Sequence, residues 1–141
     1  MYELSIQTEF AAAHAIRIRG AVEPVHGHNW RVTAVVSGAA LDADGLLVDF
    51  HALEASLHAI VKPFHNNNLN TTPPFDRLNS TAEHVARYIA QQLATHPPLS
   101  TTPHLRVHSV TVTEAPGCAA TFRPIDPHSS GHPDPHLGPG R

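Results

Sequence analysis

The chain has 141 residues, of which 41% are hydrophobic and 15% are charged, which fits one domain large enough to bury a core of its own. A formal charge of −3 and a single lysine, Lys62, argue against a general nucleic-acid binder, which would carry a basic patch. The single cysteine, Cys118, excludes an internal disulfide framework and zinc sites of the Cys-x-x-Cys type. No apolar stretch has the length of a membrane span and the first residues do not resemble a signal peptide, so we expect a cytoplasmic protein.

The hydrophobic pattern predicts a strand pair, two helices and a second strand pair. Apolar and polar residues alternate along residues 2–14, as in a half-buried strand, and the same period returns over residues 28–37. The expected elements are, in chain order, strands over 2–14 and 28–37, a helix that begins at Asp49 and ends at Pro63, a helix that begins at Ser80 and ends before Pro97, and strands over 105–114 and 119–123. This order, ββααββ, indicates an α+β fold in which both helices cover one face of an antiparallel sheet.

Residues 1–123 form the expected folded domain, and residues 124–141 form a segment rich in proline and glycine. This segment contains five of the 13 prolines and few large apolar side chains, so it cannot bury enough surface to offset the entropy lost on ordering. We expect a disordered tail. Its histidines His128, His132 and His136 leave open a separate hypothesis, in which the tail stores or delivers metal.

Three histidines share one face of the first two strands. Residues two apart on a strand point to the same side, so His26 and His28 can converge on one ion, and Gly27 between them permits the close approach of a ligand or another backbone. His14 ends the first strand in the same buried phase. Three neutral imidazoles are a natural zinc set that leaves one coordination position free. The alternative is that these are surface histidines in a chain that has 13 histidines.

Six short motifs, two of which contain these histidines, are spread over the expected domain. They are 10–14 (FAAAH), 26–30 (HGHNW), 48–50 (VDF), 69–70 (LN), 80–83 (STAE) and 113–114 (TE). With these motifs, residues 2–123 resemble the family of 6-pyruvoyl-tetrahydropterin synthase and 6-carboxy-tetrahydropterin synthase.

The resemblance implies a tunnelling fold (T-fold), in which each subunit has a four-stranded antiparallel sheet and two helices on one face. It also implies a homo-oligomer, usually a hexamer built as a dimer of trimers, with active sites between the subunits. Zinc (Zn2+) is then expected on His14, His26 and His28, with the substrate, dihydroneopterin triphosphate or a related pterin, at the free position. Zinc would act there as a Lewis acid toward the hydroxyls of the substrate side chain. We expect no nucleic-acid partner and no membrane partner.

Three further residues match the positions at which this family holds the pterin ring. Glu114 is the expected anchor, since an ionised carboxylate can accept two parallel hydrogen bonds from the amino and ring N–H groups. The alternative for Glu114 is a solvated glutamate at the edge of the sheet. Thr81 and Glu83 match the pterin pocket, but Ser80 and Glu83 also fit a capping box at the start of the second helix.

The sequence departs from the family at the catalytic cysteine, which the usual members carry a few residues before the two clustered histidines. Glu23 stands in this region instead, and the arrangement resembles a variant branch that cleaves the side chain to give 6-hydroxymethyl-dihydropterin. A carboxylate beside zinc can serve as a general base, and a loop glutamate next to Pro24 is the alternative interpretation. Cys118 lies in another strand region, and we interpret it as a small buried hydrophobic residue.

A second departure concerns the Asp–His pair that orients and exchanges the substrate proton in this family. The chain has His65 and Asn66 at these positions, and asparagine cannot act as a general acid or base. A shift of the loop by one residue would let His65 serve as the second titratable group.

Two functions remain open from the sequence. The first is a zinc-dependent lyase that acts on dihydroneopterin triphosphate or a related pterin, with Glu23 and His65 as its catalytic groups. The second is a homologue that binds zinc and pterin with little or no turnover, because the proton-transfer groups of the family are altered.

Overall fold

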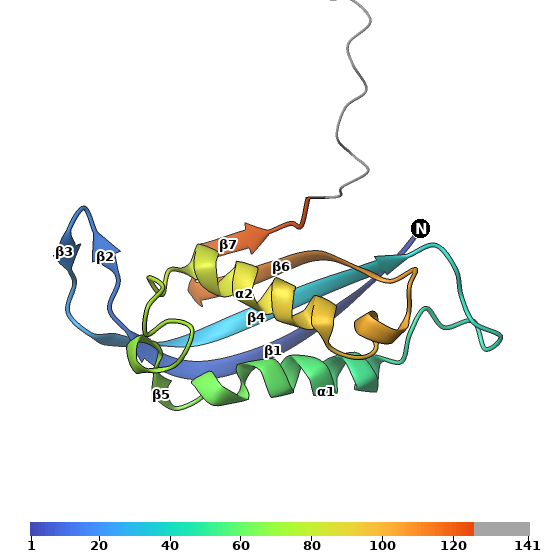
Figure 1. Cartoon of the computed structure of the whole chain (residues 1–141), viewed down its shortest axis with the longest axis horizontal. Helices are drawn as coiled ribbons and strands as arrows, with labels where there is room; N and C mark the ends of the chain where they lie inside the picture. The colour runs from blue at the N-terminus through green and yellow to red at the C-terminus, as the bar shows by residue number, and fades with distance from the viewer. Residues whose placement is uncertain (126–141) are drawn as a thin grey trace, which may run out of the picture.

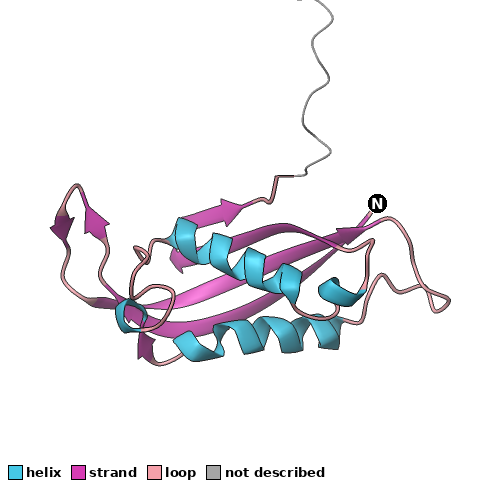
Figure 2. Cartoon of the chain, viewed as in Figure 1, coloured by secondary structure: helices cyan, strands magenta, loops and turns pink. Residues whose placement is uncertain are grey.

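Two helices lie across one face of a sheet in the computed structural model, which describes residues 1–125 (Figure 1). The long strands are β1 (Tyr2–His14), β4 (His26–Gly38), β6 (Arg106–Ala115) and β7 (Cys118–Phe122), and the helices are α1 (Phe50–Val61) and α2 (Ala82–Thr95). The sheet order is β5-β1-β4-β6-β7, and the long strands are antiparallel to their long neighbours. The predicted order ββααββ and the α+β class are confirmed for these elements (Figure 2).

Several short elements are added to this plan. β2 (Arg17–Ile18) and β3 (Ala21–Val22) form a hairpin that projects beyond the end of the sheet, at the left of Figure 1. β5 (Asn67–Asn68) pairs in parallel with β1, so the sheet has five strands rather than the expected four. The remaining short elements are the 3-10 turns η1 (Lys62–Phe64), η2 (Leu69–Thr71) and η3 (Leu99–Thr101). Elements of two or three residues are too short to leave a periodic pattern in the sequence.

β1 and β4 form the longest strand pair, and their register runs without a break over the full length of both strands. Side chains that face the helices are buried along each strand. Phe10 and Trp30, for example, lie opposite each other with their rings stacked at a centroid distance of 5.7 Å. The alternation predicted from the sequence is confirmed, and it determines which side chains of both strands face the helices.

α1 begins and ends where the sequence predicts. Asp49 is its N-cap, and the carboxylate accepts a hydrogen bond from the backbone N–H of His51 at 2.9 Å. The helix ends at Val61, and Pro63 follows in the turn η1. Leu57 on its inner side is fully buried in the core between the helices and the sheet.

α2 begins one residue later than the sequence suggests. Thr81 is its N-cap, and Oγ1 of Thr81 accepts a hydrogen bond from the backbone N–H of His84 at 3.2 Å. The expected capping box between Ser80 and Glu83 is therefore wrong. Ser80 precedes the cap and is fully buried, while Glu83 is exposed in the first turn of the helix.

The C-terminal part of the chain corrects one expectation and leaves another untested. Cys118 is exposed rather than buried, because it begins the edge strand β7 directly after the turn at Gly117. The tail expected over 124–141 lies outside the described residues from position 126 onward, together with its three histidines, and the domain boundary stays a prediction. Within residues 1–125, none of the helices combines the length and the apolar character that crossing a bilayer requires.

We expect Leu57→Ala to lower the free energy of unfolding by about 2–5 kcal/mol, because removing a buried leucine side chain leaves a cavity in the core. Urea unfolding of the full chain, followed by circular dichroism, measures this change. His58→Ala changes the next residue, which is exposed, and should alter the free energy by less than about 0.5 kcal/mol. Equal losses in the two variants would contradict this placement of the core.

Candidate metal centre and active site

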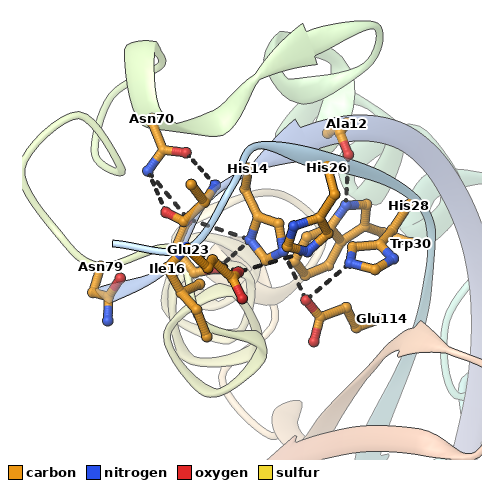
Figure 3. A network of polar contacts seen from close by, with 12 residues as sticks. Ala12, His14, Ile16, Glu23, His26, His28, Trp30, Asn70, Asn79 and Glu114 are labelled. Atoms are coloured by element: carbon orange, nitrogen blue, oxygen red, sulfur yellow. Dashed lines mark hydrogen bonds and ion pairs between the residues drawn. The ribbon is translucent and has the colours of Figure 1, made fainter. Parts of the chain in front are cut away.

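Three histidines meet at the end of the sheet where β1 ends and β4 begins. The antiparallel register places His14 opposite His26 and Ala12 opposite His28, so the imidazoles project from two adjacent strands. The ring centroids are 4.8 Å apart for His14 and His26, 5.3 Å for His14 and His28, and 4.6 Å for His26 and His28. Figure 3 shows these rings together, and the structure thus brings the three predicted metal ligands to one place.

Glu114 of β6 adds a carboxylate to the three imidazoles. Its Oε1 lies 2.7 Å from Nε2 of His14 and 3.3 Å from Nε2 of His28. One ligand atom from each of the four residues lies within 4.8 Å of every other, and we call these residues the metal group. The register of β6 and β7 is irregular between Thr113 and Ala115, and such a bulge re-aims the side chain at its centre. The structure therefore brings the predicted pterin anchor into contact with the histidines.

Two imidazole nitrogens of the metal group, Nε2 of His14 and Nε2 of His28, are buried without a hydrogen-bond partner among the described residues. The Glu114 carboxylate is close to both, but neither contact has the geometry of a hydrogen bond. Such nitrogens are rare, because a buried polar atom left unpaired costs about 1–3 kcal/mol. A metal ion held by the metal group would use these lone pairs, and imidazole and carboxylate are donors that suit zinc. The residues present therefore fit a zinc ion.

Backbone carbonyl groups fix the protonation of two of these rings. Nδ1 of His14 donates to the carbonyl oxygen of Ser80 at 2.8 Å, and Nδ1 of His26 donates to the carbonyl oxygen of Pro24 at 2.9 Å. Since a carbonyl oxygen can only accept, Nδ1 of each ring carries a proton, and in the neutral ring the lone pair is therefore on Nε2. Outer contacts of this kind orient histidine ligands toward a metal.

The third ring, His28, is held in its neutral form. Burial lowers the pKa of His28 below its ordinary value of 6.5, and the nearby carboxylate of Glu114 offsets only part of this shift. The neighbouring His26 and His14 lower the pKa of His28 further. A neutral imidazole offers its lone pair to a metal at neutral pH without first losing a proton.

Two asparagines hold the backbone that follows His14. The amide of Asn70 accepts from the N–H of Ala15 at 2.7 Å and donates to the carbonyl oxygen of Ala15 at 2.9 Å. The amide of Asn79 forms the same pair of bonds with Arg17, both at 3.0 Å. We call these two side chains the amide clamp. They bond the backbone as a neighbouring strand would, and so continue the pairing of β1 beyond its last residue.

Glu23 lies beside the metal group and is tied to the same backbone segment. Its Oε1 accepts from the N–H of Ile16 at 3.1 Å, and its own N–H donates to the carbonyl oxygen of Ile16, also at 3.1 Å. The same Oε1 lies 3.6 Å from Nε2 of His26. Figure 3 shows this carboxylate next to the imidazoles. The predicted catalytic carboxylate is thus close enough to act on a molecule bound at the metal group.

A cavity of about 480 Å³ opens beside Glu114. Thr81 and Glu83 from the start of α2 line this cavity, and so does Cys118 from the start of β7. The residues that the sequence assigns to the pterin ring therefore share one cavity, whose volume is in the range of about 300–1,000 Å³ that is usual for small-molecule sites. Cys118 was not expected in this place.

His65 does not join the metal group of its own chain. Its side chain is exposed, and its Nδ1 accepts a hydrogen bond from the backbone N–H of Ala11 at 3.2 Å. Nδ1 is therefore the unprotonated nitrogen of the ring, and Nε2 carries the proton. Asn66 adopts a left-handed backbone with φ of 59°, which asparagine tolerates better than most residues.

Sequence reasoning missed the residues that support the histidines. Trp30 lies edge-on to His14 at a centroid distance of 4.8 Å, and its Nε1 donates to the carbonyl oxygen of Ala12 at 3.2 Å. Alternation alone assigns this residue to the core and gives no hint of a second role. Asn70 belongs to a motif that matches the family, although the sequence does not indicate what its side chain does. Asn79 belongs to none of the motifs, and nothing in the sequence indicates its role.

Fold and site together define a class of protein in which clustered histidines and a carboxylate lie at the end of an antiparallel sheet, next to a small-molecule cavity. The model of the 6-pyruvoyl tetrahydropterin synthase family matches residues 3–124. The chain belongs to this family.

Two curated relatives match part of the chain. A provisionally named 6-carboxy-5,6,7,8-tetrahydropterin synthase of Archaeoglobus fulgidus is 34% identical over 67 residues, which cover 48% of this chain and 57% of that protein. The 6-carboxy-5,6,7,8-tetrahydropterin synthase of Bacillus subtilis is 39% identical over 59 residues, which cover 40% of each protein. The chain therefore matches less than two thirds of the length of either relative.

Solved structures share the fold over nearly their full length. The 6-pyruvoyl tetrahydropterin synthase of Caenorhabditis elegans aligns with a TM-score of 0.76 at 20% identity, covering 88% of this chain and 96% of that chain. The Plasmodium vivax enzyme, in a form whose catalytic glutamate is replaced by alanine, aligns with a TM-score of 0.71 at 23% identity, covering 86% and 96%. These matches confirm the predicted T-fold.

We expect Asn79→Ala to weaken zinc binding by about tenfold. The variant loses the side chain that ties residue 79 to the backbone of Arg17, and the next residue, Ser80, orients His14 with its carbonyl group. Competition with a chromophoric chelator measures the affinity. Gln91→Ala, at an exposed position of α2, is the matched control and should leave the affinity unchanged. An unchanged affinity in Asn79→Ala would show that the amide clamp does not support the metal group.

Proposed function

We propose that this chain is a zinc-dependent lyase that acts on dihydroneopterin triphosphate or a related pterin. The single observation that carries the proposal is the metal group, in which two buried imidazole nitrogens lack a partner among residues 1–125 and lie next to a cavity lined by Glu114. Membership in the 6-pyruvoyl tetrahydropterin synthase family supports the pterin as substrate.

Zinc is held by His14, His26 and His28 in this proposal. When bound, it supplies a Lewis acid for the hydroxyl groups of the substrate side chain. The pairing of Nδ1 with carbonyl oxygens at two of the rings supports this role, since in the neutral ring it leaves the lone pair on Nε2, the ligand nitrogen.

Glu114 anchors the pterin ring, and Thr81 and Glu83 complete the wall of the cavity around it. A carboxylate accepts two parallel hydrogen bonds from the amino and ring N–H edge of a pterin. The Thr81 hydroxyl uses its oxygen to cap α2 and retains its proton to donate to a ligand. The shared cavity supports these assignments.

Glu23 is the catalytic base, and it takes a proton from the substrate side chain. Two observations support this role: Oε1 of Glu23 lies 3.6 Å from Nε2 of His26, and its bond to Ile16 fixes its position. A glutamate is also the catalytic residue in the Plasmodium vivax relative. Since the chain has glutamate in the region of the usual cysteine, we propose that it cleaves the first carbon–carbon bond of the side chain. The base takes the proton of the second hydroxyl, the bond breaks, and the ring-bound carbon regains a proton, so that 6-hydroxymethyl-dihydropterin leaves together with a two-carbon aldehyde that carries the triphosphate.

His65 is the second titratable group, and it acts on a site of a neighbouring subunit. It is exposed and does not contact the metal group of its own chain, so only a site between subunits can use it. We therefore propose a homo-oligomer, a hexamer built as a dimer of trimers, in which the active sites lie between subunits.

We expect Glu23→Gln to lower kcat by about 10²–10⁴-fold, because the amide keeps the shape of the side chain and cannot take up a proton. Zinc-loaded full chain is mixed with dihydroneopterin triphosphate, and the pterin products are quantified by chromatography. Zinc content should stay at the wild-type level in the variant.

Glu54→Gln is the control for this experiment, because Glu54 is an exposed carboxylate on α1. Its activity should match that of the wild type. If the wild type binds pterin and zinc but forms no product, the chain is a binding homologue without turnover and the proposed lyase is wrong. Full activity in Glu23→Gln would exclude Glu23 as the base.

Mixing two inactive variants tests whether His65 acts across a subunit boundary. Glu23→Gln and His65→Gln are expected to be nearly inactive alone. After joint unfolding and refolding at equal amounts, about a quarter of the sites should hold both wild-type residues if each comes from a different subunit of a symmetric oligomer. Activity is measured on the mixture, and refolded single variants are the controls. No recovery above the single variants would contradict a shared site.

A further inference from the structure

We infer that Trp30 is a positioning residue of the metal group, which holds the imidazoles of His14 and His28 where they converge on the metal. The indole does this through its ring contacts and through the N–H that it donates to the backbone of Ala12. This role rests on the zinc site of the proposed function, and it is independent of the reaction proposed there.

The indole reaches the metal group over the small side chain of Ala12. Trp30 is paired with Phe10, which lies four residues before His14 on β1. The backbones of Trp30 and His14 are therefore about 13 Å apart along the strand direction, yet the centroids of their rings are only 4.8 Å apart. Ala12 lies between them on the same buried face, opposite His28, so no large side chain stands in the path of the indole.

The indole packs against two of the three imidazoles at once (Figure 3). Its plane makes an angle of 81° with the His14 ring and of 86° with the His28 ring, whose centroid is 5.7 Å away. Perpendicular contacts of this kind are a favoured arrangement of neighbouring aromatic rings. Trp30 and His14 are both 0% exposed, and close packing leaves neither ring room to turn. The indole therefore fixes the planes of two ligand rings relative to each other.

A hydrogen bond holds the indole itself in place. Nε1 of Trp30 donates to the carbonyl oxygen of Ala12 at 3.2 Å. Ala12 is paired with His28 on β4 and with Asn67 on β5, so this bond ties the indole to the point where three strands meet. The indole has a single N–H donor. Phenylalanine, which has no such donor, would keep part of the packing and lose the bond.

The other side of the indole belongs to the core. Phe10 is stacked on it at a centroid distance of 5.7 Å, and Phe64 packs against Phe10 at 5.8 Å. Within residues 1–125, Trp30 is the aromatic side chain of the core that contacts these imidazoles. A change at Trp30 should therefore move the metal ligands, whereas a change at Phe64 should affect the core alone.

Trp30→Phe tests this role, with Phe64→Leu as the matched control, because both changes reduce a ring that is at most 1% exposed. Zinc affinity is measured by competition with a chromophoric chelator. The full chain is also loaded with cobalt(II), whose visible absorption depends on ligand geometry. We expect Trp30→Phe to bind zinc at least about tenfold more weakly and to change the cobalt spectrum.

Phe64→Leu should lower the midpoint of urea unfolding and leave the zinc affinity and the cobalt spectrum at their wild-type values. Wild-type zinc affinity in Trp30→Phe would overturn the inference, and so would an equal loss of affinity in the two variants.

A second measurement needs no variant, because Trp30 is the single tryptophan of the chain. Its indole N–H gives a single resonance in the nitrogen–proton correlation spectrum of the full chain. Saturating zinc should shift this resonance, because the rings that contact the indole become metal ligands. A resonance that stays in place while zinc binds would overturn the inference, even if Trp30→Phe fails to fold, and would leave the proposed zinc site intact. Failure of the wild type to bind zinc would overturn both.

Discussion

The register between β1 and β4 is the constraint on which the site depends. Because side chains alternate along a strand, the pairing of His14 with His26 and of Ala12 with His28 places all three imidazoles on one side of the sheet. A slip of one residue would turn the histidines of one strand to the opposite face. The stacked pair of Phe10 and Trp30 lies on the same face of the same two strands. Core packing and ligand placement are thus consequences of one register.

Two strands alone would leave the His14 ring without orientation, and the segment before α2 supplies it. Asn79 bonds the backbone at Arg17, Ser80 gives its carbonyl oxygen to His14, and Thr81 caps the helix. Three consecutive residues therefore connect the helix, the end of β1 and the metal group. This arrangement explains why Ser80 is fully buried although it is polar, since its carbonyl and hydroxyl groups both face Nδ1 of His14.

The sequence predicts those features of the fold and site that depend on local periodicity. The alternation of β1 and β4 predicts that the three histidines share a face, and the N-cap Asp49 predicts the start of α1. It does not predict contacts that depend on two segments meeting in space. The amide clamp joins residues more than 50 positions apart in the chain, and the exposure of Cys118 depends on β7 being an edge strand.

The capping of α2 shows a different limit of local reasoning. Ser80 and Thr81 are both good caps by residue type, and a box between Ser80 and Glu83 satisfies the local rule. The tertiary contact of Ser80 with His14 decides between them. The local signal therefore fails beside the metal group, where Ser80 is engaged by its contact with another element.

The two carboxylates near the histidines differ in how they are held. Oε1 of Glu23 lies beside His26 and is bonded to the backbone of Ile16, so its position is fixed before any ligand arrives. Glu114 lies beside His14 and His28 on a bulge without strand pairing. A base must already be in place when the substrate binds, since proton transfer requires contact at hydrogen-bond distance. Glu114 instead touches two of the three imidazoles and also lines the cavity, so it lies where a molecule in the cavity would meet the metal group.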